Sequence, residues 1–382
     1  MFRKGVLTNK LKQLNISIWL LLTVLIYGRA VSVSGSEKPN LSEPLKKCWA
    51  YGGENGLSKI IASDNESNII LTIDNYSIIS LNPNSKLENW KAASGGKLES
   101  DAIVDGNNLF YITYFENEDR QKTYTLNSIS LKTGLTNWQI KLKSYSEINL
   151  KQSDNKDLLF ITTGDNSLSA IKKSNGERIW TKEFSGLFVS IEASSKTDGL
   201  NILLDDRLLK VSAKNGEAFK ENKLKKNRIS SSIVKENYLL LGYTTGELTK
   251  INTENNKSET DWKIKTGAGI SGLVEYRDEV LTTSLDNFIY LFSNDNGKLK
   301  WKKRVAGRIN IEPQIFGTFA AVINSGDNST TVVDLRDGKS INQIQLEQNN
   351  FFSGRSLLTD TYFILQTSRG IYFFVNTDAV CK

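Results

Sequence analysis

Histidine is absent from this chain, and cysteine, methionine and proline are scarce: the 382 residues include two cysteines, one methionine and four prolines. Without histidine the chain cannot form a Ser-His-Asp or Cys-His catalytic triad, an HExxH zinc protease site or a metal site built from imidazoles. Two cysteines are too few for a four-cysteine zinc finger or an iron–sulfur cluster. These absences argue against most catalytic and metal chemistry, and we expect no catalytic residues, no metal site and no cofactor.

The positive charge of the chain is concentrated at its beginning. The 49 Lys and Arg against 42 Asp and Glu give a net charge of +7. Residues 1–30 hold five of these bases and no acid, so the remaining residues carry 44 bases against 42 acids, a net charge of +2. A nearly neutral remainder gives little support to a nucleic-acid partner, and we expect none.

The N-terminus has the layout of a secretory signal. Basic residues precede the apolar run Ile16–Gly28, and small residues close it at Gly28 and Ala30. The run is shorter than the roughly 20 residues that a membrane-spanning helix needs, although an uncleaved anchor is the alternative. No cysteine precedes Cys48, so none directly follows the run to be modified with lipid. We predict a signal peptide over residues 1–30, a linker over 31–45 and a single domain over 46–382, with no membrane span once the signal is removed.

From about residue 46 onward, short alternating apolar runs recur between Asn, Asp and Gly clusters, and no amphipathic helix is evident. The best-preserved part of the repeat is a turn, a strand, a second turn and a tryptophan. The tryptophans or their replacements advance by 48, 42, 39, 43, 39 and 41 residues, with Phe219 replacing tryptophan in the fourth unit and Ile341-Asn342 standing in the seventh. A period of about 40 to 45 residues made of strands predicts an all-β fold, an eight-bladed β-propeller of four-stranded blades.

The repeated residues have expected structural roles. Asn-Gly and Asp-Gly pairs such as Asn175-Gly176 suit tight turns that need positive φ. Each tryptophan then begins an outermost strand, where we expect its indole to pack between neighbouring blades. The alternative, stacking on a ligand, would require the indoles to face the central channel. The tryptophans concerned are Trp49, Trp90, Trp138, Trp180, Trp262 and Trp301.

The two ends of the domain complement each other. The last repeat has no outermost strand before the chain stops at Lys382, whereas the domain opens with Lys47-Cys48-Trp49 before the first complete blade. We expect this N-terminal strand to complete the eighth blade and close the ring. Closure would bring Cys48 near Cys381 in a protein exported to an oxidising compartment, which predicts a disulfide between them. Two unrelated free thiols are the alternative.

The repeat units SISLKTGLTNW, SAIKKSNGERIW and YLFSNDNGKLKW resemble those of quinoprotein-type (PQQ-repeat) propellers over nearly the whole mature chain. Such repeats occur in quinoprotein alcohol dehydrogenases, in the BamB family of outer-membrane assembly factors and in lumenal stress-sensor domains of the endoplasmic reticulum. The resemblance is greatest to the BamB family. It implies a non-enzymatic periplasmic scaffold without a cofactor, which holds the machinery that assembles β-barrels in the outer membrane. The chain departs from that family in lacking the cysteine that anchors a lipoprotein.

Two other functions remain open at this point. A reduced quinoprotein dehydrogenase would use PQQ and calcium. A lumenal or extracellular recognition or sensor propeller would place the chain in the endoplasmic-reticulum lumen or outside the cell rather than in the periplasm. Glycan occupancy would favour the latter, and the glycosylation sequons begin at Asn40, Asn65, Asn75, Asn256 and Asn328.

The basic segment 223–228, between the fourth and fifth repeats, is the candidate site for protein partners, because such connections lie on one rim of a propeller. We predict contacts from Leu224 and Arg228, an apolar anchor beside a cation, together with Lys225 and Lys226. A solvated basic loop is the alternative. We expect a monomer that binds other proteins through its rim loops.

Two acidic or polar clusters are interpreted as turns. Asp205-Asp206 sits at a hairpin tip, where neighbouring side chains point to opposite faces and are poorly placed for joint acid–base catalysis. The segment Asn294–Gly297 resembles a calcium loop superficially, but Phe292 stands in place of the first ligand and no glutamate closes the loop.

Overall fold

The computed structural model describes residues 38–52, 58–64, 67–74, 76–99, 102–142, 149–152, 157–194, 198–225, 227–254, 258–324, 328–376 and 381. Its contacts divide the chain into Met1–Lys38 and Pro39–Lys382. All described strands belong to the second unit. The predicted signal peptide and residues 31–37 of the predicted linker lie outside the described residues.

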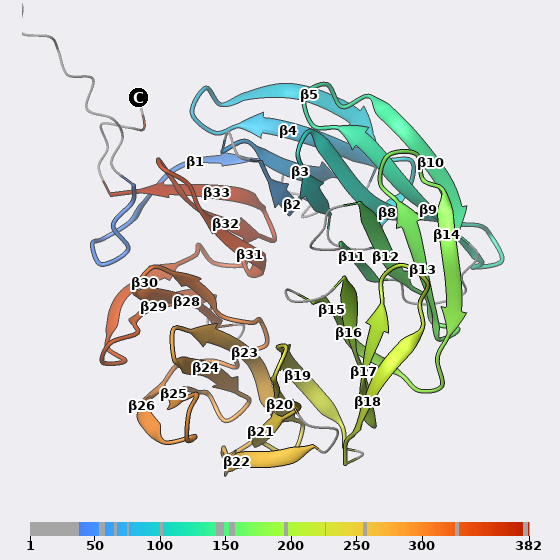
Figure 1. Cartoon of the computed structure of the whole chain (residues 1–382). Coiled ribbons are helices and arrows are strands. Elements are labelled where there is room, and N and C mark those ends of the chain that lie inside the picture. The colour runs from blue at the N-terminus through green and yellow to red at the C-terminus, as the bar shows by residue number, and fades with distance from the viewer. Residues whose placement is uncertain are drawn as a thin grey trace, which may run out of the picture. The chain divides into compact units, whose positions relative to one another are not determined.

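The described residues form eight antiparallel sheets, each a blade of a propeller, as the repeat period predicts (Figure 1). In six blades, four strands that are consecutive in the chain run from the centre of the ring outward. The first blade contains β2 (Lys59–Ser63), β3 (Ile69–Ile73), β4 (Ser77–Asn82) and β5 (Leu87–Ala93). The third contains β11 (Asn149–Gln152), β12 (Leu158–Thr162), β13 (Ser167–Lys172) and β14 (Arg178–Glu183). The fourth contains β15 (Phe188–Ala193), β16 (Gly199–Leu204), β17 (Arg207–Ser212) and β18 (Ala218–Lys223).

The remaining regular blades repeat this order. The fifth contains β19 (Ile229–Val234), β20 (Tyr238–Tyr243), β21 (Glu247–Asn252) and β22 (Glu259–Lys265). The sixth contains β23 (Ile270–Tyr276), β24 (Glu279–Ser284), β25 (Phe288–Ser293) and β26 (Leu299–Arg304). The seventh contains β27 (Gln314–Phe316), β28 (Phe319–Asn324), β29 (Ser329–Asp334) and β30 (Ser340–Gln345).

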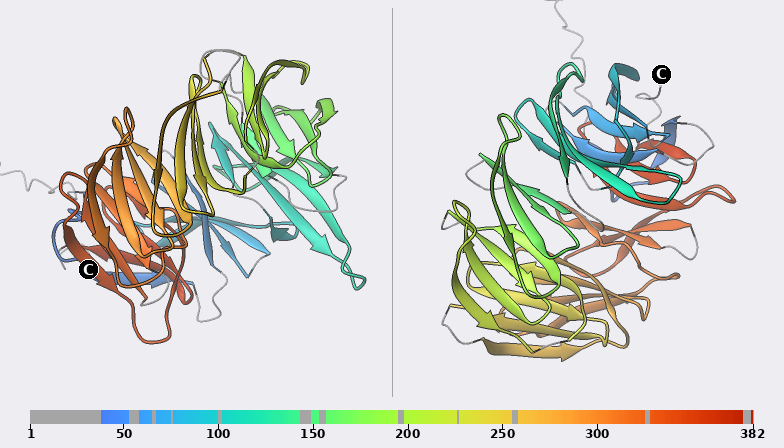
Figure 2. Two further views of the ribbon diagram at one scale, coloured as in Figure 1. Left: turned by 90° about the horizontal axis from the view of Figure 1, so that it is seen from below. Right: turned by 90° about the vertical axis from the view of Figure 1, so that its right-hand side faces the viewer.

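The second blade differs at its inner edge. Two short strands, β6 (Lys97–Leu98) and β7 (Ile103–Asp105), share the innermost position, and both pair with β8 (Asn108–Glu116). Outside β8 lie β9 (Lys122–Ser130) and β10 (Thr136–Leu142). The β8–β9 hairpin is long, with nine residues in each strand, and its tip projects past the neighbouring blades (Figure 2).

The eighth blade closes the ring. It contains β31 (Phe352–Leu358), β32 (Phe363–Thr367) and β33 (Gly370–Val375), and its outermost strand is β1 (Lys46–Tyr51) from the start of the domain. Figure 1 shows β1 beside β33. The predicted closure by the N-terminal strand is therefore confirmed. The predicted disulfide is also present: Cys48 and Cys381 are bonded, with their Cα atoms 5.2 Å apart.

The segment just before β1 also packs onto the ring, within the range expected to be a linker. Leu41 is 1% exposed and belongs to the hydrophobic cluster between the seventh and eighth blades. The Asn342 side chain of β30 donates to the Glu43 carbonyl (2.8 Å), and the Asn376 side chain after β33 donates to the Asn40 carbonyl (3.0 Å). The N-terminal segment thus contacts both the seventh and the eighth blade.

Hydrophobic clusters fill the spaces between blades. Among the described residues there is one such cluster between each pair of neighbouring blades, including the pair formed by the eighth and first. Strands such as β16, β29 and β33 are buried along their whole length. A blade therefore buries both of its faces, and each face depends on the adjacent blade.

The tryptophans lie on outermost strands and hydrogen-bond to the next blade. Each indole Nε1 donates to the carbonyl of the residue that directly follows the third strand of that blade. The pairs are Trp90 with Leu131 (2.6 Å), Trp138 with Lys173 (2.9 Å), Trp180 with Ala213 (2.8 Å), Trp262 with Asn294 (3.0 Å) and Trp301 with Leu335 (2.9 Å). A turn glycine lies against each ring; at Gly297, where φ is +68°, an added Cβ would lie 2.8 Å from Trp262. Trp49 instead stacks on Phe373, with ring centroids 3.8 Å apart.

The strand register corrects the expectation that Phe219 replaces the tryptophan of the fourth blade. Lys210 pairs with Lys220, just as Lys250 pairs with Trp262 in the fifth blade. Phe219 is 59% exposed. The ammonium of Lys220 donates to the carbonyls of Thr253 and Glu254, both at 2.8 Å, and Thr253 directly follows the third strand of the fifth blade. Lys220 therefore makes the contact that an indole makes elsewhere.

Phe219 occupies the position that the strand pairing skips, as one residue is also skipped directly before Trp90, Trp138, Trp180, Trp262 and Trp301. In the fourth blade the pairing shifts between Lys210 and Val211, so that Ala218 and Lys220 are paired and Phe219 is skipped. A shift of one residue reverses the face on which a side chain lies. Burial, with the nearby positive charge of Lys210, lowers the pKa of Lys220. The two carbonyl acceptors offset the cost of holding this ammonium between blades.

Removing the disulfide is expected to destabilise the domain. Cys48→Ser should lower the free energy of unfolding by about 2–5 kcal/mol, because the bond joins residues 333 positions apart in sequence and restricts the unfolded chain. Cys381→Ser and the double variant should lose the same amount, since all three remove one bond. Urea unfolding measures these values, and equal stability of the oxidised wild type and the double variant would contradict the prediction.

Lys220 is expected to stabilise the contact between the fourth and fifth blades. Lys220→Met keeps an unbranched stem but loses both hydrogen bonds, so it should lower the free energy of unfolding by about 1–2 kcal/mol. Phe219→Met is the matched control, and its exposed side chain predicts a change within about 0.5 kcal/mol. A larger loss for the Phe219 variant in the same urea titration would show that the register has been assigned wrongly.

Candidate functional site

The antiparallel strand order sorts the loops onto two faces of the ring. The connections between blades and the central hairpin of each blade emerge on one face, which we call the connection face; it includes Leu187, Arg228, Leu285 and Phe351. The two other hairpin turns of each blade emerge on the opposite face, which we call the turn face; it includes Asp64, Asn107 and Lys132.

The basic segment predicted to bind partners lies on the connection face, between β18 and β19. Lys225 and Arg228 are exposed, and Lys226 lies outside the described residues. The Arg228 carbonyl accepts a hydrogen bond from the Thr244 amide at 3.1 Å, which fixes the backbone before β19. Leu224 is half-buried and packs against the hydrophobic cluster between the fourth and fifth blades. The exposed chemistry of this segment is therefore its cations.

An exposed apolar side chain occupies the same position one blade earlier. The Leu187 carbonyl accepts from the Asp205 amide at 3.1 Å, the bond that Arg228 makes with Thr244. Leu187 is 65% exposed. Phe351 of the eighth blade makes the equivalent bond to Ser368 at 2.7 Å and is 50% exposed. Sequence reasoning missed both residues, because each precedes an apolar strand and resembles the first residue of that strand.

A carboxylate moderates the positive charge near the predicted segment. A hydrogen bond from Lys263, at 2.6 Å from the Glu247 carboxylate, holds the pKa of Glu247 below its usual value, and the positive charge of Lys225 acts in the same direction. Glu247 therefore stays ionised at neutral pH. The connection face at the fourth and fifth blades combines an apolar side chain, two exposed cations and one paired carboxylate.

The two clusters interpreted as turns lie in turns. The Asp205 carboxylate accepts from the Leu187 amide at 3.2 Å, and Asp206 pairs with Arg207 at 3.4 Å. The Asn294 carbonyl accepts the Trp262 indole. Within the described parts of the chain, no three Asp, Glu, Cys or His side chains are grouped as they would be to hold a metal ion.

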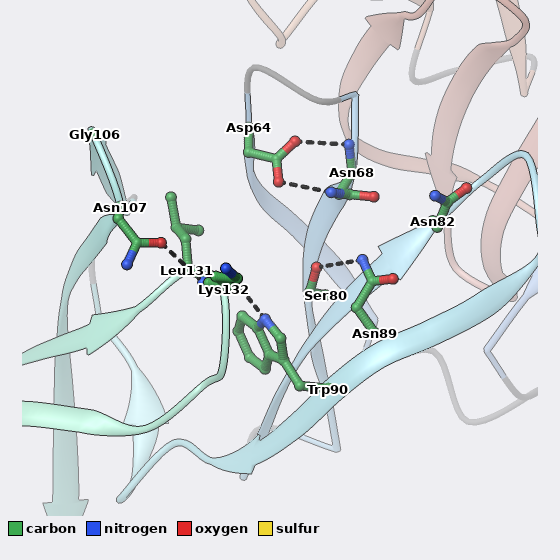
Figure 3. Close-up of a pocket in the computed structure, with 10 residues that line it drawn as sticks. All are labelled: Asp64, Asn68, Ser80, Asn82, Asn89, Trp90, Gly106, Asn107, Leu131 and Lys132. Carbon is green, nitrogen blue, oxygen red and sulfur yellow. Dashed lines mark hydrogen bonds between the residues drawn. The ribbon is translucent and has the colours of Figure 1, made fainter.

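The turn face has a pocket of about 560 Å³ between the first and second blades (Figure 3). Asp64 and Asn68 flank the turn between β2 and β3, and the Asp64 carboxylate accepts from the backbone amide of Asn68 at 2.8 Å and from its side-chain amide at 2.9 Å. The indole of Trp90 forms part of the wall. The other lining residues are Ser80, Asn82, Asn89, Gly106, Asn107, Leu131 and Lys132.

Comparison with known proteins identifies relatives by repeat and by fold. The family model described as "Outer membrane protein assembly factor BamB" matches residues 125–259 and 255–378, which is more than half of the chain. No curated protein matches the sequence.

Solved structures share the propeller fold at low sequence identity. BamB from Moraxella catarrhalis superposes with a TM-score of 0.62 at 14% identity, covering 87% of this chain and 99% of that one. The computationally designed Ika8 protein gives 0.67 at 10% identity, covering 86% and 99%. The C-terminal WD40 domain of Sif2 gives 0.62 at 13% identity, covering 87% and 98%. A search of the described residues for a helix long and apolar enough to span a bilayer finds none.

Proposed function

Since this chain belongs to the family of the outer membrane protein assembly factor BamB, we propose that it is an exported, non-enzymatic scaffold that binds the machinery assembling β-barrel proteins in the outer membrane. The family match supports protein binding as the function of this chain. The closed ring, with loops on two faces, supplies rigid surfaces for such binding. The proposal includes no catalytic step, because the chain has no histidine and the acidic residues singled out in the sequence serve turns.

The observation that carries the proposal is that Leu187 and Arg228 are both exposed on the connection face. They occupy equivalent positions in adjacent blades, directly before the inner strands β15 and β19. Arginine is enriched among the residues that dominate binding energy at protein interfaces, and an exposed leucine adds apolar area that a partner can bury. The backbone of both residues is fixed by a hydrogen bond to the neighbouring hairpin, so little ordering is needed on binding.

Export is proposed on two grounds. Residues 1–30 have the composition of a signal peptide. The Cys48–Cys381 disulfide suits an oxidising compartment such as the periplasm. We propose that the signal is cleaved after Ala30 and that the mature protein acts as a monomer.

Cleavage is directly measurable. N-terminal sequencing of the protein isolated from its native host should read from Val31, because the small residues Gly28 and Ala30 end the apolar run at signal-peptidase spacing. Recovery of a chain that still begins at Met1, held in the membrane fraction, would contradict cleavage and favour the anchor.

Replacing an apolar side chain by a charged one, or reversing a charge, on the connection face should strongly weaken partner binding. Leu187→Asp and Arg228→Glu are each expected to reduce recovery of β-barrel assembly components by at least about tenfold in affinity purification from the native host, as expected for residues at an interface centre. Leu135→Asp and Lys214→Glu are the matched controls, since both residues are exposed and lie on the turn face. Thermal unfolding checks that all four variants keep the fold.

Three results would contradict this prediction or the proposal behind it. Recovery of the same partners by the two connection-face variants at wild-type levels would place the interface elsewhere. Loss of partners only in the turn-face variants would assign binding to the opposite face. Failure of the wild type to recover any β-barrel assembly component would reject the proposed partner.

A further inference from the structure

The pocket between the first and second blades has small residues at two positions that larger residues occupy between the fourth and fifth blades. Ser80 pairs with Trp90 in the first blade, as Lys210 pairs with Lys220 in the fourth. Gly106 precedes Asn107, whose carbonyl accepts from Leu131; in the fifth blade Glu236 precedes Asn237, whose carbonyl accepts from Thr253. Ser80 and Gly106 of the pocket thus correspond to Lys210 and Glu236.

In the space between the fourth and fifth blades, this pair fills the equivalent site. The Lys210 ammonium donates to the Glu236 carbonyl at 2.7 Å and to its carboxylate at 3.3 Å. Their side chains are 16% and 13% exposed. A serine and a glycine cannot make this contact, so the corresponding volume between the first and second blades stays open.

A different lysine fills the space between the second and third blades. Lys173 corresponds to Leu131 of the pocket, because each carbonyl accepts the preceding blade's tryptophan. The Lys173 ammonium folds back to Asp105 at 2.8 Å and Gln152 at 3.3 Å, and the residue is 8% exposed. Leu131 has no polar group with which to close the pocket in this way.

The open pocket is lined by side-chain amides of asparagine that still have unused hydrogen-bond donors or acceptors. The Asn89 side chain donates to Ser80 at 3.1 Å, and in Figure 3 its oxygen points away from Ser80. The Asn82 oxygen accepts two backbone amides, which leaves its NH2 group as a donor. Asn68 is 7% exposed, and its side-chain oxygen has no hydrogen-bond partner among the described residues. In Figure 3 this oxygen points away from Asp64, toward the side of the pocket that holds Asn82.

The chemistry of this lining suits a neutral ligand rich in hydroxyl groups. Side-chain amides offer a donor and an acceptor side by side, which matches neighbouring hydroxyls that both donate and accept. The pocket contains one carboxylate, Asp64, and one ammonium, Lys132, so its formal charge balances. Its volume lies within the range of about 300–1,000 Å³ that small-molecule sites occupy. We propose that this pocket binds an uncharged carbohydrate of one or two sugar rings.

Sugar binding is tested on the full exported protein with three probes: maltose, cellobiose and N,N′-diacetylchitobiose. Saturation-transfer-difference NMR and calorimetric titration should show saturable binding of at least one probe at micromolar to millimolar concentration. Ser80→Lys should abolish it, because the new ammonium can reach the Gly106 carbonyl as Lys210 reaches the Glu236 carbonyl. Asn89→Ala should weaken it about fivefold, as expected for one lost hydrogen bond.

The second blade supplies a matched control. Asn137 precedes Trp138 and donates to Ser128 at 3.2 Å, just as Asn89 precedes Trp90 and donates to Ser80. Asn137 does not line the pocket, so Asn137→Ala should bind the sugar as the wild type does. If Ser80→Lys fails to fold, the comparison of the two asparagine variants decides alone.

Either of two results would overturn the proposal: no saturable binding of any of the three probes, or binding that Asn89→Ala and Asn137→Ala reduce equally or not at all. The connection-face variants Leu187→Asp and Arg228→Glu should bind sugar normally, because those residues lie on the opposite face of the ring. The test of the carbohydrate site is therefore independent of the test of the proposed protein partners.

Discussion

The fold depends on one constraint: every blade has two apolar faces, and each must be covered by a neighbour. Strands such as β16 and β29 are buried from end to end, so an isolated blade would expose a large apolar surface. Seven of the spaces between blades are covered by blades that follow one another in sequence, but the eighth requires the two ends of the domain to meet. Pairing of β1 with β33 and the Cys48–Cys381 bond act at that closure, and the burial of Leu41 holds the preceding segment between the seventh and eighth blades.

Contacts between blades repeat by position rather than by residue type. Five indoles donate to the carbonyl that follows the third strand of the next blade, and a glycine turn leaves room for each ring. In the fourth blade the Lys220 ammonium reaches the same carbonyl, and in the seventh the Asn342 amide reaches the N-terminal segment. An indole or an ammonium thus reaches this carbonyl in six of the blade contacts that the structure describes, whereas Asn342 uses another acceptor and the Trp49 ring stacks on Phe373. This explains how the repeats can drift in sequence while the ring keeps its geometry.

The two proposed binding sites lie where individual blades differ from their neighbours in side-chain chemistry. The connection face and the turn face both arise from strand order, which is the same in every blade. On the first, Leu187 and Arg228 occupy equivalent positions with different chemistry, and this difference creates the proposed protein surface. On the second, Ser80 and Gly106 stand where Lys210 and Glu236 fill the space between the fourth and fifth blades, and this difference leaves room for the proposed carbohydrate pocket. Both sites are departures from the repeat, held on a rigid ring.

The sequence by itself determined the all-β class, the blade period, the closure by Lys46–Tyr51 and the partner of Cys48, because these follow from spacing along the chain. The sequence also held the tryptophan position of the fourth blade, because Lys220 follows Gly216 by four residues just as Trp180 follows Gly176. Tertiary structure alone decided that Leu224 turns toward the core and that Leu187 is exposed one blade before the predicted basic segment. The physical reason is that both residues lie in connections between strands, where no periodic pattern predicts burial and the neighbouring blades decide which side chains are covered. The pocket was equally hidden, since it depends on residues from two blades that only the packing of the first blade against the second brings together.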